Sequence, residues 1–220
     1  MKKLLVTALA ALSFFGLTLN AQAEGEPPRF EGIYGGLFAA YGIMDGTFVY
    51  NGMARPDFDL NGPGAGVNGG VNWTNDMWLW GLEADGQTLG MQDTDTCNGG
   101  CNVTVETDGV VTARARVGVL FGEDRQMAAY ATGGAALVWL GIRNNGGAGE
   151  TTQPVETTFA VGGGVEGYLF GTDWMSTKLE YLYVGVDLTK RGVTVNTGDR
   201  GDFGFEGLHL IRWGLNIHFN

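Results

Sequence analysis

After its first two dozen residues the sequence lacks any apolar run as long as a membrane helix. Such a helix needs about 20 consecutive apolar residues, and residues 4–19, the nearest match, are fewer and lie at the chain start. Lys2 and Lys3 precede this run, and Ala21-Gln22-Ala23 follows it, which is the pattern of a secretory signal peptide. We predict a signal peptide over residues 1–23, in preference to a retained helix, and one exported domain over residues 24–220. A mature chain of this kind can enter a membrane only as a β-barrel.

Cysteine is almost absent, since Cys97 and Cys101 are the only two in the chain. In an exported protein such a pair forms a disulfide more often than a metal site, and two sulfurs alone make a poor zinc site. We therefore predict a disulfide that shapes a loop tip, and we expect no metal ion.

Histidine is equally scarce. His209 and His218 both lie in the last segment of the chain, and the sequence offers no Ser-His-acid spacing for nucleophilic catalysis. We expect no catalytic residue and no cofactor, so the protein is not predicted to be an enzyme. A lipid-modifying role for His209 is the weaker alternative.

Basic residues are in deficit. The chain has 13 Lys and Arg against 24 Asp and Glu, a net charge of −11, which disfavours nucleic acid as a partner. Proline is rare, with five residues, whereas the 39 glycines occur inside apolar segments as well as in turns. This composition excludes a collagen-like or disordered chain, and the length suits a single all-β domain.

Polar and apolar residues alternate over eight segments of roughly 10–14 residues, about the length of a tilted strand that crosses a membrane. The segments are residues 30–42, 66–74, 77–88, 108–121, 126–141, 156–169, 174–187 and 206–219. The connections between them are long and short in turn, as in transmembrane barrels with external loops and short periplasmic turns. We predict an all-β fold, an eight-stranded antiparallel transmembrane β-barrel with both chain ends in the periplasm.

The connections carry different expectations. The predicted external loops are residues 43–65, 89–107, 142–155 and 188–205, which are rich in Gly, Asn, Asp and Thr. The predicted turns are residues 74–76, 122–125 and 170–173. We expect the loops to contact partners, because loop residues vary more freely than the strands that hold them.

One face of the alternating segments is charged. Its members are Glu83, Asp85, Arg114, Arg116, Glu166, Lys178, Glu180 and Arg212, four acids and four bases. Facing lipid, each basic group near the midplane would cost about 2–4 kcal/mol. We predict that all eight face the lumen, where an eight-stranded barrel has room only for packed side chains. A charge-balanced network follows, with ion conduction as the alternative.

Four segments resemble the small outer-membrane barrels of the opacity-protein and alphaproteobacterial surface-porin type. They are residues 30–36 (FEGIYGG), 80–85 (WGLEAD), 178–184 (KLEYLYV) and 212–219 (RWGLNIHF). The resemblance spans nearly all of the predicted mature chain. It implies an OmpA-like barrel in the bacterial outer membrane, in contact with lipid and lipopolysaccharide. It also implies that the barrel assembly machinery reads the aromatic last strand, which ends in Phe219.

These observations favour a structural or surface protein of the outer membrane. The barrel would be its anchor, and the loops would bind host or surface partners. Two alternatives remain at this stage: a narrow porin-like pore lined by the charged face, and a secreted lipocalin-like barrel that binds a ligand inside.

Overall fold

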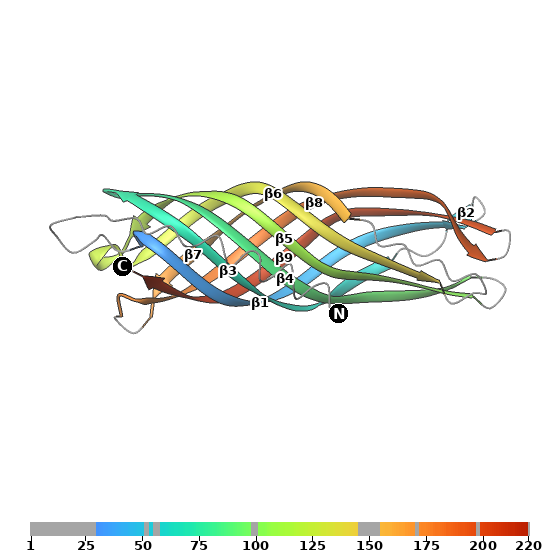
Figure 1. Ribbon diagram of the computed structural model, residues 1–220, viewed down its shortest axis with the longest axis horizontal. Helices are drawn as coiled ribbons and strands as arrows, with labels where there is room; N and C mark the ends of the chain where they lie inside the picture. Colours follow the sequence, from blue (N-terminus) through green and yellow to red (C-terminus); the bar gives the residue numbers. More distant parts are fainter. Residues whose placement is uncertain are drawn as a thin grey trace.

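The structure, a computed structural model, describes residues 30–50, 53–54, 58–97, 101–144, 155–169, 172–196 and 199–219. Eight long strands dominate it (Figure 1): β1 (Gly32–Tyr50), β3 (Phe58–Asn75), β4 (Trp78–Cys97), β5 (Cys101–Phe121), β6 (Met127–Asn144), β7 (Val155–Tyr168), β8 (Met175–Asn196) and β9 (Asp199–Phe219). The strand β2 (Met53–Ala54) has two residues, and η1 (Glu123–Arg125) is one turn of 3-10 helix. Among the described residues, no helix has the length and apolar content that a membrane span requires.

The eight long strands form a closed barrel. Each pairs antiparallel with the next long strand in the sequence, and β1 also pairs with β9, from Ile33 opposite Phe219 to Tyr50 opposite Gly201. The short strand β2 only extends a hairpin from the tip of β1. This arrangement confirms the predicted eight-stranded antiparallel barrel.

The barrel has two different ends (Figure 1). One end, the turn end, carries the last residues of β9 and the short connections around residues 76–77, 122–126 and 169–174. The other, the tip end, carries β2 and the tips of the hairpins β4–β5 and β8–β9. At the turn end Arg125 donates hydrogen bonds to the carbonyl oxygen and carboxylate of Asp76, at 2.9 and 2.6 Å, and so joins two neighbouring turns.

The prediction of four long external loops is wrong in extent. The strands continue through most of the segments that were assigned to loops, and only residues 51–57, 98–100, 145–154 and 197–198 separate the long strands there. The sequence predicted loops in these segments because their composition is polar and rich in Gly and Asn. Above the lipid, however, backbone pairing can continue while the outward side chains are polar, so that composition does not end a strand.

The outer surface carries an apolar band next to the turn end. On β9 the outward residues Ile211, Trp213, Leu215, Ile217 and Phe219 are exposed. The ten steps from His209 to Phe219 rise about 25 Å at ~3.3 Å per residue and a tilt of about 40°, which matches the apolar height of an outer-membrane barrel. A soluble lipocalin-like barrel would turn these side chains inward, so that alternative is wrong.

Candidate functional site in the barrel interior

The eight charged residues that the sequence singled out all lie inside the barrel and are at most 5% exposed. The strand register makes three acid-base pairs direct cross-strand neighbours. Glu83 of β4 lies opposite Arg114 of β5, Glu166 of β7 opposite Lys178 of β8, and Glu180 of β8 opposite Arg212 of β9. Side chains alternate along a strand, so pairing in this register puts both members of each pair on the inner face.

Glu83 is the centre of the network. Its carboxylate accepts hydrogen bonds from Arg114 Nη2 at 2.6 Å, from Lys178 Nζ at 2.7 Å and from the Tyr34 hydroxyl at 2.7 Å. Lys178 lies on β8, which is not adjacent to β4 in the sheet. The ion pair between Lys178 and Glu83 therefore spans the lumen instead of following the wall.

A second group of charges lies beside the first. Arg114 contacts Asp85 at 2.8 Å and Glu180 at 3.1 Å, and Arg212 contacts the same two carboxylates at 3.1 and 3.5 Å. Two cations thus share two anions. Because each charge has more than one opposite neighbour, the desolvation of every group is offset by several contacts.

Glu166 organises the third group, nearest the turn end. It pairs with Arg116 at 2.7 Å and accepts hydrogen bonds from Ser176 Oγ at 2.6 Å and Asn216 Nδ2 at 2.7 Å. His218 Nε2 lies 2.9 Å from the same Ser176 hydroxyl. This trio of serine, histidine and acid lacks catalytic geometry, because the serine binds the acid directly and all three side chains are buried.

Aromatic rings cover two of the cations. The guanidinium of Arg116 lies 3.9 Å from the ring centre of Tyr130 and 5.4 Å from that of Tyr34, and Arg212 lies 4.8 Å from the ring centre of Phe38. Such contacts stabilise a desolvated cation. The sequence did not single out these aromatic residues or Ser176. Alternation along the last strand does place Asn216 and His218 on the same face as Arg212.

Apolar layers enclose the charged layer on both sides. Toward the tip end lie Met44, Leu60, Leu89, Met91, Val110, Ala136, Val138, Leu140, Ala160, Leu182, Val184, Val186, Leu208 and Leu210, all buried. Toward the turn end lie Phe30, Leu79, Leu120, Ala128 and Tyr130, with Tyr168 packed against them. The backbone N–H of Phe30 donates to the Tyr168 hydroxyl at 3.0 Å, which holds the start of the described chain across the lumen.

The charged side chains are tightly packed in the described part of the lumen. The side chains of the interior ion pairs are 0–1% exposed. These packed charges join strands across the lumen as well as along the wall.

A closed antiparallel barrel with an apolar outer band and a charged interior defines the class of transmembrane β-barrels. The family model for the outer membrane protein beta-barrel domain matches residues 7–219. The chain belongs to this family, which is one of the bacterial outer membrane. No curated protein sequence matches the chain.

Solved barrels of the outer membrane are similar to the chain at low sequence identity. The outer membrane protein OprG from Pseudomonas aeruginosa is 12% identical, with a TM-score of 0.56 over 87% of this chain and 98% of that one. Neisserial surface protein A is 14% identical, with a TM-score of 0.44 over 86% and 98%. Ail, the attachment invasion locus protein of Yersinia pestis, solved with a heparin analogue, is 14% identical, with a TM-score of 0.42 over 83% and 99%.

Proposed function

We propose that the protein is a non-catalytic surface barrel whose interior is a permanent plug and whose tip end contacts partners outside the cell. The supporting observation is the ion pair between Lys178 and Glu83 across the lumen, together with its buried neighbours. A pore needs mobile water along its axis, whereas a network of short, dry ion pairs is rigid.

The protruding strands support the surface role. Asp45, Asp59, Asn61, Gln92 and Thr94 face outward near the tip end, and all are exposed. Above the apolar band the barrel therefore presents a polar wall of paired strands to water. Partners of this wall would include lipopolysaccharide and host or surface molecules. They would contact mainly the outward side chains of paired strands and only secondarily the loops.

Export and assembly complete the proposal. Residues 1–23 are removed as a signal peptide, and the assembly machinery recognises the last strand, in which Phe219 is outward and exposed. Cys97 and Cys101 are register partners at the tip of the β4–β5 hairpin. That backbone position favours a disulfide between them, which would fasten the tip; their side chains lie outside the described set.

Conductance tests the plug. Purified barrel in a planar bilayer is expected to give no steady current, and Arg114→Ala is expected to produce channel openings, because it removes contacts to three carboxylates. Arg125→Ala, at the surface of the turn end, is the matched control. A steady wild-type current that changes with Arg114→Ala would overturn the plug in favour of the narrow pore.

A further inference from the structure

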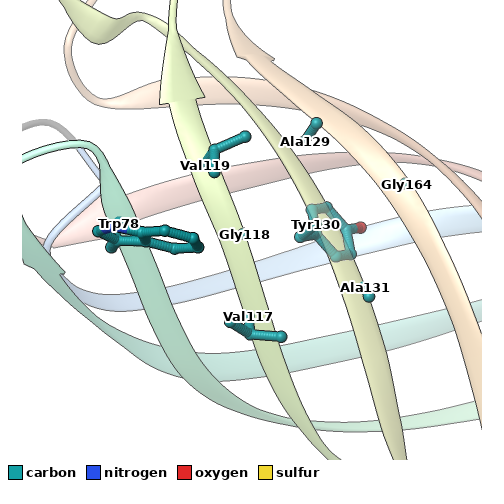
Figure 2. A pocket seen from close by; sticks show the side chains of 8 residues that line it. All are labelled: Trp78, Val117, Gly118, Val119, Ala129, Tyr130, Ala131 and Gly164. Carbon is teal, nitrogen blue, oxygen red and sulfur yellow. The ribbon is translucent and has the colours of Figure 1, made fainter.

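The outer wall has a depression near the turn end that the plug does not explain (Figure 2). Its lining includes Trp78 of β4, Val117 and Val119 of β5, and Ala129 and Ala131 of β6, and its volume is about 430 Å³. Figure 2 shows Trp78, Val117 and Val119 on one side of the depression and the small side chains of Ala129 and Ala131 on the other. We call this shallow depression the groove.

The groove results from small outward residues on β6. Ala129, Ala131, Gly133 and Ala135 take successive outward positions on β6. The neighbouring strand β5 places Val119 opposite Ala129 and Val117 opposite Ala131. Between the alanines, Tyr130 turns inward and its hydroxyl donates to Glu180 at 3.1 Å. Only backbone and methyl groups therefore form the floor, and hydrocarbon is the chemistry that fits it.

The register gives the depth of the groove. Phe121 opposite Met127 is the last β5–β6 pair at the turn end, and the groove pairs Val119 with Ala129 and Val117 with Ala131 lie two and four residues further in. At ~3.3 Å per residue and a tilt of about 40°, these pairs lie about 5–10 Å from that edge. With the turns in the periplasm, as in barrels of this class, the groove faces the periplasmic leaflet.

The adjacent turn carries charges of both signs. Arg125 is half exposed and paired with Asp76, and Glu123 and Asp124 precede it as exposed residues. One cation and three anions give this edge a net charge of −2. An anionic headgroup would be repelled there, whereas a zwitterionic headgroup offers a phosphate to Arg125 and an ammonium to the acids.

We propose that the groove binds one acyl chain of a phospholipid with an ammonium headgroup, from the periplasmic leaflet. The chain lies on Ala129 and Ala131 against Trp78, and the headgroup contacts Arg125 and its acidic neighbours. The alternative occupant is a second barrel. A second barrel is convex and would contact the groove over a short length only, whereas an acyl chain can follow it.

Native mass spectrometry of the purified full-length barrel tests the proposal. The protein is delipidated in detergent and mixed with phosphatidylethanolamine or phosphatidylglycerol of identical chains. We expect one retained phosphatidylethanolamine, with about fivefold preference over phosphatidylglycerol, the size expected from a few exposed charge contacts. Equal retention of both lipids would overturn the headgroup assignment, and dimers without retained lipid would overturn the proposal in favour of a second copy.

Two variants localise the site. Ala131→Leu fills the groove and is expected to abolish retention, and Arg125→Gln is expected to remove the headgroup preference but not the chain contact. Ala39→Leu adds the same bulk at an exposed outward position of β1, which is separated from β6 by β3, β4 and β5, and should leave retention unchanged. Retention by Ala131→Leu at the wild-type level would overturn the site, and a gel shift on boiling shows that each variant is folded.

Discussion

The two halves of the barrel have opposite patterns. In the half toward the turn end, the membrane half, the outer face is apolar and the interior contains all eight charged residues. In the half toward the tip end, the tip half, the interior holds Met44, Leu60 and Leu208 and the outer face carries Asp45 and Asp59. One set of strands therefore passes from the pattern of a membrane barrel to that of a soluble one. The solvent outside changes from lipid to water along the strands, and the preferred side for apolar side chains changes with it.

Removal of the central acid should most strongly destabilise the membrane half. Glu83→Ala leaves Lys178 without the carboxylate that it contacts at 2.7 Å, and we expect a loss of about 3–5 kcal/mol in the free energy of unfolding. Chemical unfolding in lipid vesicles, followed by tryptophan fluorescence, measures it. The double variant Glu83→Ala with Lys178→Met should recover part of the loss, and equal stability of the single and double variants would contradict the ion-pair explanation.

The tip half should depend on its apolar interior. Leu208→Ala opens a cavity in a layer that is fully buried, and the expected loss is about 3 kcal/mol in the same unfolding measurement. Gln92→Ala, on the exposed outer face of this half, should change stability by less than about 0.5 kcal/mol. Similar effects of both variants would show that the tip half has no hydrophobic core of its own.

An added outward charge should distinguish the two environments directly. Leu215→Arg places a guanidinium in the apolar band and is expected to destabilise the barrel by about 2–3 kcal/mol. Gln92→Arg places the same group above the band, where water solvates it, and should be neutral. If the two substitutions shifted the unfolding midpoint equally, the assigned height of the band would be wrong.

The smallest effect is expected at the turn end. Asp76→Ala removes the ion pair to Arg125, whose side chains are 73% and 51% exposed. Water and salt screen such a pair, so the loss of stability should stay below about 1 kcal/mol and should shrink further at high salt. A larger, salt-independent loss would indicate that the join between the two turns is needed for closure of the barrel.

Alternation in the sequence predicted one charged face on each of the strands β4, β5, β7, β8 and β9, and these residues are buried in the structure. Charged residues that share a strand, such as Lys178 and Glu180 of β8, occupy alternate positions. Because side-chain direction in a strand has a period of two, residues at alternate positions point to the same face. The apolar inner layer near the tips was harder to predict, because residues such as Met91 and Leu140 lie in or beside segments whose polar outer residues resemble a loop.

The sequence by itself determined the number of strands, the shared face of the eight charged residues and the neutral sum of their charges, because all three depend on local period and composition. The tertiary structure alone decided that the strands continue beyond the membrane, that Lys178 reaches Glu83 from 95 residues away, and that Ala129 and Ala131 form a groove beside Trp78. These features depend on closure and register between distant strands, which fix the partners of a side chain only when the barrel is complete.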